Sequence, residues 1–205
     1  MFLGVEKKKN LKSKGHNQEE TMRQNIKIRI GGFVLLSMLF VTGVCYAKSA
    51  REIDASVDTA LDRFQKEVFG AKELMAKAKG ILVFPRVIKA GIGLGGEYGT
   101  GAHRGKGKTV DYYNTITGSF GFQLGGQVKN VYLFFMNEQA LKDFQFDDGW
   151  QAGVDGSVAL IKAGADGSID TTKTNEPIIA YVLGQKGLMY NLTLEGSKFN
   201  KIKPS

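Results

Sequence analysis

The stretch that decides the fold is KAGIGLGGEYGTGAHRGKGKT, residues 89–109, which holds eight glycines in twenty-one residues. Residues 91–96 read GIGLGG and so match G-x-G-x-x-G, the fingerprint of dinucleotide-binding proteins. That fingerprint requires a helix that begins at the glycines and points its N-terminus at the pyrophosphate. Glycine also occupies positions 99, 101, 105 and 107, and each would destabilise a helix by about 1 kcal/mol. The stretch therefore argues against a nucleotide site of this kind.

A phosphate-binding P-loop is excluded on similar grounds. Residues 102–109, AHRGKGKT, carry alanine where a P-loop has its first glycine, and a strand pattern follows instead of a helix. The glycines instead predict an extended segment in which every second side chain is missing. Such a face lets another backbone, an aromatic ring or a ligand approach closely. The predicted glycine face consists of Gly91, Gly93, Gly95, Gly121 and Gly125.

Two helices are predicted before the glycine stretch, and strands around and after it. In residues 50–69 apolar side chains recur every three or four positions, which is typical of an amphipathic helix, and helical character resumes over 71–79. Asn137 is the expected N-cap of a short helix over 137–144. Strands are predicted over 81–84 (ended by Pro85), 109–127, 131–136, around 153–162, 178–184 and 188–196. Since helices and strands do not alternate, we expect an α+β fold, in which N-terminal amphipathic helices pack on a strongly curved or barrel-like antiparallel β-sheet of about six to eight strands.

The N-terminal part of the chain indicates export. Residues 1–47 are predicted to be an extension with a secretory signal peptide, and residues 48–205 to be one domain. The apolar run over 33–46 follows basic residues and ends in small ones, the order typical of a signal peptide. An uncleaved membrane anchor is the alternative, and the true start is either Met1 or Met22. We expect a periplasmic or cell-envelope location, with the protein peripheral on a membrane.

The residue content argues against catalysis, metals and cofactors. The sole cysteine, Cys45, lies in the predicted signal peptide, and His103, the only histidine after residue 47, is expected in a solvated loop. Zinc sites need clustered Cys and His side chains. The net charge is +8, but +5 of it belongs to residues 1–47, so the rest of the chain does not indicate nucleic-acid binding. We therefore predict a protein that is not an enzyme and takes no metal, cofactor, nucleotide or nucleic acid.

A group of basic residues brackets the glycine stretch: Arg86, Lys89, Arg104, Lys106 and Lys108. We predict that they contact lipid phosphate, since each Lys or Arg near an anionic membrane contributes about 1 kcal/mol. A solvated basic loop is the alternative. Glu97 is the only acidic residue between positions 81 and 110, and we expect it to pair with a basic neighbour. Trp150, the only tryptophan, is either a core residue or an anchor at a membrane interface.

Several longer motifs resemble the SYLF family of lipid-binding domains. They are AKGILVFPRVIKAGIGLGGEYGTG, YYNTITGSFGFQLGGQ, VYLFFMNEQALKDF, DDGWQAGVDGSV and IIAYVLGQKGLMYNLTLEGSKFNKI, and they cover roughly residues 55–202. The resemblance implies a non-catalytic exported protein that associates with phospholipid, through anionic head groups, at an envelope membrane. Two alternatives stay open: a structural or partner-binding envelope module without a lipid ligand, and a barrel-type carrier of an apolar ligand.

Overall fold

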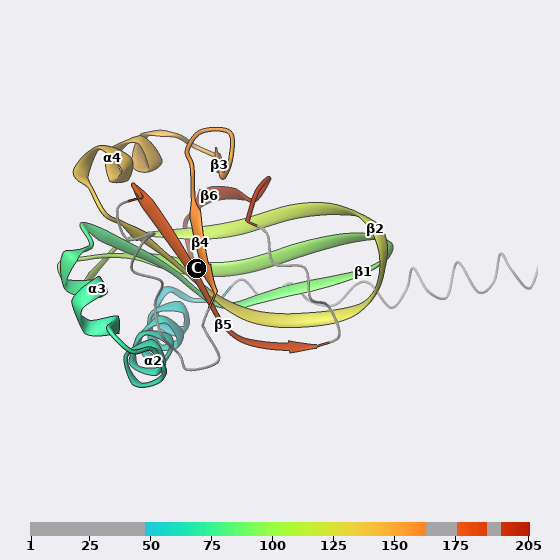
Figure 1. The fold of residues 1–205 in the computed structure, drawn as a ribbon, viewed down its shortest axis with the longest axis horizontal. Helices are drawn as coiled ribbons and strands as arrows, with labels where there is room; N and C mark the ends of the chain where they lie inside the picture. The colour runs from blue at the N-terminus through green and yellow to red at the C-terminus, as the bar shows by residue number, and fades with distance from the viewer. Residues whose placement is uncertain (1–47, 163–175, 188–193) are drawn as a thin grey trace, which may run out of the picture. The chain divides into compact units, whose positions relative to one another are not determined.

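The computed structural model describes residues 48–162, 176–187 and 194–205, with the side chains of all but 92–94, 119–125, 162 and 185–187. The predicted signal peptide, its start sites and most of the last predicted strand lie outside the described residues. Figure 1 shows the order of the described elements along the chain: two helices, two long strands, a third helix and four shorter strands.

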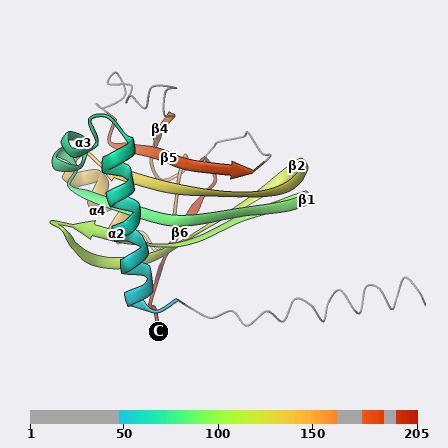
Figure 2. The same ribbon diagram turned by 90° about the horizontal axis from the view of Figure 1, so that it is seen from below.

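Helices α2 (Ala50–Glu67) and α3 (Ala71–Lys77) confirm the two predicted N-terminal helices. A capping box begins α2: the Glu52 backbone N–H donates to Ser49 Oγ over 3.3 Å, and the Ser49 N–H donates to Glu52 Oε2 over 2.9 Å. Gly70, in the left-handed conformation with φ of 79°, leads from α2 into α3. In Figure 2, α2 lies across the long strands near one end of the sheet.

Two unusually long strands, β1 (Gly80–Gly105) and β2 (Lys108–Phe135), pair antiparallel and form a ribbon. The predicted end of a strand at Pro85 is wrong, because a β-bulge at this position accommodates a residue that cannot donate a ladder hydrogen bond. The strands predicted over 109–127 and 131–136 are likewise parts of the continuous β2.

The ribbon bends in its middle and returns toward its own start (Figure 1). At the bend the pairing changes register between Ile92 and Leu94 of β1. Glycines face each other on both sides of this change, Gly91 opposite Gly125 and Gly96 opposite Gly118. Glycine and bulges are the devices that let a sheet curve sharply, so the strong curvature expected from the glycine stretch is confirmed.

The bend divides β1 into a first arm before Ile92 and a second arm after Leu94. These two arms contact each other at positions where the second arm has glycine. A side chain at Gly101 would collide with the carbonyl oxygen of Val83, and one at Gly99 would lie 3.0 Å from the carbonyl oxygen of Arg86. In a straight strand, residues 83 and 101 would be about 60 Å apart, yet here they are neighbours. The close approach depends on two glycines that lie outside the predicted glycine face.

Within the described residues, six strands form one sheet in the order β3-β6-β2-β5-β4, with β1 paired to β2. The shorter strands are β3 (Trp150–Gln151), β4 (Ala159–Lys162), β5 (Ile178–Gly187) and β6 (Lys198–Ile202). The first arm of β2 pairs with β6 and its second arm with β5, so the bend of the ribbon curls the whole sheet.

One pairing departs from the expected antiparallel sheet: β4 runs parallel to β5. The chain between residues 162 and 178 is long enough for the crossover that a parallel pair needs. Sequence patterns did not predict β6, because KFNKI has too few apolar residues to show the alternation typical of a strand.

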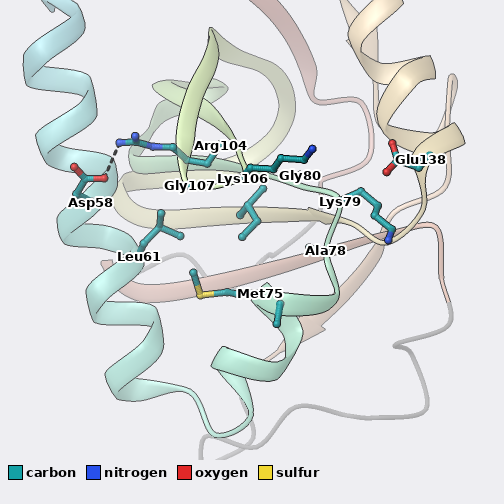
Figure 3. A pocket seen from close by; sticks show the side chains of 12 residues that line it. Asp58, Leu61, Met75, Ala78, Lys79, Gly80, Arg104, Lys106, Gly107 and Glu138 are labelled. Atoms are coloured by element: carbon teal, nitrogen blue, oxygen red, sulfur yellow. Dashed lines mark hydrogen bonds and ion pairs between the residues drawn. The ribbon is translucent and has the colours of Figure 1, made fainter.

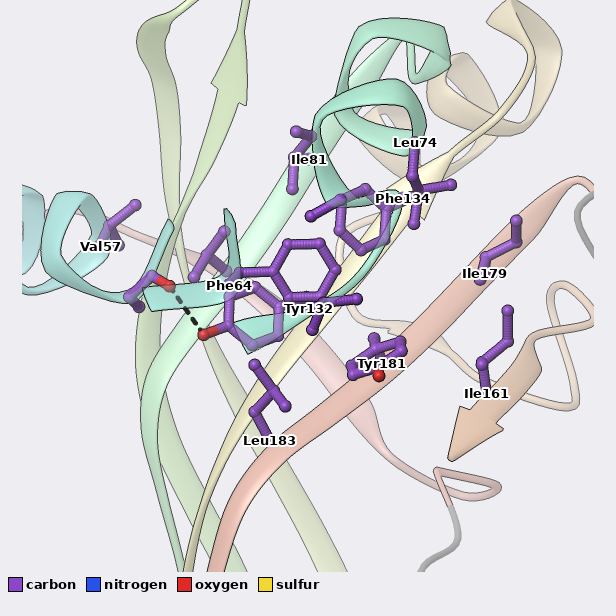
Figure 4. Close-up of a cluster of buried hydrophobic side chains, with 14 of the residues drawn as sticks. Val57, Phe64, Leu74, Ile81, Tyr132, Phe134, Ile161, Ile179, Tyr181 and Leu183 are labelled. Carbon is purple, nitrogen blue, oxygen red and sulfur yellow. Dashed lines mark hydrogen bonds between the residues drawn. The ribbon is translucent and has the colours of Figure 1, made fainter. Parts of the chain in front are cut away.

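The curled sheet carries a buried hydrophobic cluster on each of its two faces. On the outer face, α2 and α3 cover β1, β2 and β5, and the Phe64 ring contacts Tyr132 and Tyr181 (Figure 4). Inside the curl lies α4 (Glu138–Phe146), capped as predicted by Asn137, whose Oδ1 accepts the Ala140 N–H over 2.8 Å. Strands buried on both faces read as continuously apolar runs, which explains sequences such as ILVF and VYLFF.

Replacing Gly101 by alanine would place a methyl group against the Val83 backbone and close to the Phe84 ring. We expect the free energy of unfolding to fall by at least about 2 kcal/mol, as for other overpacked sites. Urea denaturation followed by circular dichroism measures the change. Gly118→Ala is the matched control, since no atom lies within 4 Å of its added side chain. Equal stabilities of the two variants would show that the arms of β1 do not meet.

Candidate functional site

Glu97 lies inside the curl and pairs with one lysine from each long strand. Its Oε1 is 3.1 Å from Lys89 Nζ, its Oε2 is 2.7 Å from Lys129 Nζ, and all three side chains are at most 6% exposed. The expected pairing of Glu97 with a basic neighbour is confirmed. Lys129 was not foreseen, because its contact with Glu97 exists only once the ribbon has folded back.

Arg104, near the end of β1, ties the ribbon to α2. Its Nη2 donates to Asp58 Oδ1 over 2.6 Å and to the Asp54 carbonyl oxygen over 3.2 Å. The Asp54 carboxylate also accepts hydrogen bonds from Thr109 Oγ1 (2.6 Å) and the Tyr112 hydroxyl (2.9 Å). Arg104 Nε is buried and has no acceptor within the part of the chain that the structure describes. The guanidinium is thus held in place while one of its donors stays unused.

Lys106 and Gly107 form the turn that joins β1 to β2. Gly105 pairs with Lys108, and φ is positive at both turn residues (50° and 76°), as in a two-residue type I′ turn. This turn, and not a phosphate-binding loop, accounts for the sequence GKGK. The exposed Lys106 side chain therefore projects from a fixed hairpin end.

A pocket of about 470 Å³ lies between α2, α3, the start of β1 and this turn (Figure 3). Its lining includes three cations (Lys79, Arg104, Lys106), two acids (Asp58, Glu138) and three apolar side chains (Leu61, Met75, Ile81). In Figure 3, Arg104 reaches across to Asp58 on α2. The volume suits a small ligand or a head group, and cations above apolar side chains suit an amphiphile with an anionic group.

Three of the five predicted phosphate-binding residues gather at this end of the ribbon: Arg104, Lys106 and Lys108. Arg86 is exposed on the first arm of β1 beside the bulge, and Lys89 is buried inside the curl. Lys79, which no sequence pattern singled out, joins the pocket because it directly precedes β1. The only sequence feature that could have indicated Lys79 is its position as a basic residue between a predicted helix and a predicted strand.

Two further predicted positions lie away from the pocket. The predicted glycine face falls at the bend, where Gly91 faces Gly125 and Gly95 faces Ser119 across the ribbon. Trp150 lies in the core inside the curl, where its ring packs against those of Phe144 and Phe199. An interfacial anchor needs an exposed ring, which the buried Trp150 does not offer.

His103 is buried, so the expectation that it lies in a solvated loop is wrong. The reason is that β1 continues past the glycines and places His103 beneath α4, with Nδ1 3.5 Å from the Gln145 amide nitrogen. Burial lowers the pKa of the imidazole below its ordinary value.

No group of three or more His, Cys, Asp or Glu side chains within the described residues is placed to hold a metal ion. None of the described helices is both long and apolar enough to cross a bilayer.

Comparisons with known proteins give a family and a relative. The Ysc84 family, described as Las17-binding protein actin regulator, matches residues 116–203. The match begins within β2 and so leaves out α2, α3 and β1. The chain is also 30% identical over 155 residues to a protein of Aeromonas veronii named Beta cell expansion factor A. That alignment covers 75% of this chain and 58% of the relative, so the chain spans less than two thirds of the relative's length.

The buried His103 predicts a loss of stability in mild acid. Because its pKa is lowered in the folded state, the unfolded chain binds a proton at pH values where the folded protein does not. Above a pH of about 6.5, the pKa of histidine in the unfolded chain, the contribution of His103 to the unfolding free energy should stay constant. It should decrease as the pH falls from there toward the lower pKa of His103 in the folded protein. His103→Leu should flatten this part of the profile, measured by urea denaturation at several pH values. A His103→Leu profile as steep as that of the wild type would contradict the prediction.

Proposed function

We propose that this protein binds phospholipids with anionic head groups at a membrane surface, because residues 116–203 match the Ysc84 family and the sequence motifs resemble SYLF lipid-binding domains. The proposal includes export to the cell envelope, where the protein meets such a membrane, and a role in binding without catalysis. The family assignment supports the ligand class, and the pocket at the end of the ribbon supports the place of binding.

The Arg104 guanidinium, which lines the pocket, is the observation that carries the proposal. A guanidinium offers five N–H donors in one plane and matches the oxygens of a phosphate. Asp58 takes up Nη2, but Nε is buried and lacks an acceptor among the described residues. A buried donor without an acceptor costs about 1–3 kcal/mol. A lipid phosphate in the pocket would lie beside the positive charge of this guanidinium, because Arg104 lines the pocket.

The lysines around Arg104 supply the attraction to an anionic surface. Lys79 and Lys106 line the same pocket, and neither forms an ion pair with a described acidic side chain. Lys108 lies beside Lys106 on the turn and is also exposed. Each such charge near an anionic membrane contributes about 1 kcal/mol. The apolar side chains of Leu61 and Met75 offer a surface for the glycerol and the first methylenes of a lipid.

Neutralising the turn should weaken membrane binding. For the double variant Lys106→Asn and Lys108→Gln, we expect about 30-fold weaker binding, because two charges of about 1 kcal/mol each are lost. Asparagine is chosen at 106 because it tolerates a positive φ. The measurement is flotation with phosphatidylcholine vesicles that do or do not contain phosphatidylglycerol. Arg86→Gln is the control, since Arg86 is exposed but lies on the other arm of the ribbon.

The same experiment separates the remaining function classes. Wild-type protein that fails to float with either kind of vesicle would rule out membrane binding and leave a module that binds protein partners. Lipid that copurifies with the protein and is retained by the double variant would indicate an internal carrier. Flotation of the double variant equal to that of the wild type would remove the turn from the site.

A further inference from the structure

The connection between α2 and α3 presents a large apolar side chain to solvent. Phe69 is 82% exposed, although it lies between two helices whose other apolar residues face the core. Exposing a phenylalanine ring to water is unfavourable, and burying it in an apolar environment would contribute about 1.5–3 kcal/mol. The sequence did not single out Phe69, because this residue is the last one of the predicted amphipathic helix over 50–69 and follows the apolar residues that pack in the core.

The exposure of Phe69 is fixed by its neighbours and is not that of a loose loop. Val68 is 4% exposed and Ala71 is 2% exposed, so the chain is anchored in the core on both sides. The backbone turns tightly between them: the Val68 N–H donates to the Phe64 carbonyl over 3.0 Å, and the Ala71 N–H donates to the Val68 carbonyl over 3.2 Å. Gly70 takes the left-handed conformation that this turn requires. The ring is therefore held outward by an ordered turn.

The charges that flank Phe69 fit an anionic surface. Lys66 and Lys72 lie three residues before and three residues after Phe69 in the sequence, are exposed, and form no ion pair with any described residue. The nearby acids are already neutralised within their helices: Glu67 pairs with Arg63 at 2.7 Å and Glu73 with Lys77 at 2.8 Å. An apolar tip between two free lysines is the arrangement that inserts a ring below the phosphates while the ammonium groups stay at the phosphates.

We propose that this elbow, residues 66–72, inserts Phe69 into the interfacial layer of an anionic phospholipid membrane. The inference rests on the proposed function, because the same membrane must reach the pocket. The helix α3 connects the two places: it begins at the elbow, and residues in its last turn line the pocket. Seven residues of helix span about 10 Å, and Figure 3 shows Met75 of α3 at the pocket. The elbow adds an apolar contact to the electrostatic one at the pocket.

A second exposed phenylalanine offers a matched control within the same protein. Phe146, the last residue of α4, is 88% exposed. Two acidic residues, Asp147 and Asp148, follow it directly. Both phenylalanines are thus single rings at a helix end, but an anionic membrane attracts the surroundings of Phe69 and repels those of Phe146.

The test compares Phe69→Ala with Phe146→Ala by flotation on vesicles of phosphatidylcholine mixed with phosphatidylglycerol. Burial of one phenylalanine ring corresponds to at least about tenfold in affinity. We therefore expect Phe69→Ala to bind about tenfold or more weakly than the wild type, and Phe146→Ala to bind equally well. Both positions are exposed, so circular dichroism should show unchanged folding.

A second readout reports insertion directly. In Phe69→Trp, the emission of the new indole should shift to shorter wavelength with these vesicles and be quenched by brominated lipids, whereas in Phe146→Trp it should stay unchanged. Trp150 is buried in both variants and gives a common background. If the wild type floats but Phe69→Ala floats equally and the indole at position 69 stays in water, the elbow inference is wrong and the proposed function stands. If the wild type does not float, both are wrong. If Phe69→Ala alters the oligomeric state in solution, the ring is covered by a second copy of the chain, which also overturns the inference.

Discussion

The position of every part of the candidate site depends on one contact, in which the backbone of β1 near Val83 lies against the backbone of the same strand at Gly101. The contact returns the far end of the ribbon to its beginning. Lys79, which precedes β1, and Lys106, in the turn that follows it, line one pocket for this reason. Without the return they would be separated by the whole length of the strand. The glycines at 99 and 101 make the approach sterically possible, and larger side chains at these positions would prevent it.

The folded ribbon also encloses charge. Glu97 on the second arm of β1 receives Lys89 from the first arm and Lys129 from β2. Removing one partner of a buried ion pair costs about 3–5 kcal/mol, because a charge is left buried without a partner. The Glu97 carboxylate therefore stabilises the folded ribbon by keeping the two lysines paired. The apolar contacts around this group pack the inside of the curl, and α2 and α3 cover its outside. The sheet therefore separates two hydrophobic cores, one on each face. Arg104 connects the sheet to α2 at the pocket.

Local patterns predicted the local structure well. The apolar stripe placed α2, Asn137 placed α4, and the absence of βα alternation gave the fold class. The misses involve contacts between residues distant in sequence. Pro85 predicted the end of a strand, but a β-bulge accommodates it and the strand continues. The burial of His103 depends on the path of the ribbon, which local sequence does not reveal. Among the predicted basic residues, composition alone could not separate the exposed Lys106 from the buried Lys89, since both flank the same glycines.

The return of β1 on itself can be measured directly by electron spin resonance. Spin labels at Arg86→Cys and Thr100→Cys, with Cys45 replaced by serine, report the separation of the two arms. The contact of Gly99 with the backbone of Arg86 predicts that the labels lie close together, within about 20 Å, since neighbouring strands are roughly 5 Å apart. A straight strand would place them about 46 Å apart. A distance distribution centred near the larger value would contradict the folded ribbon and, with it, the pocket.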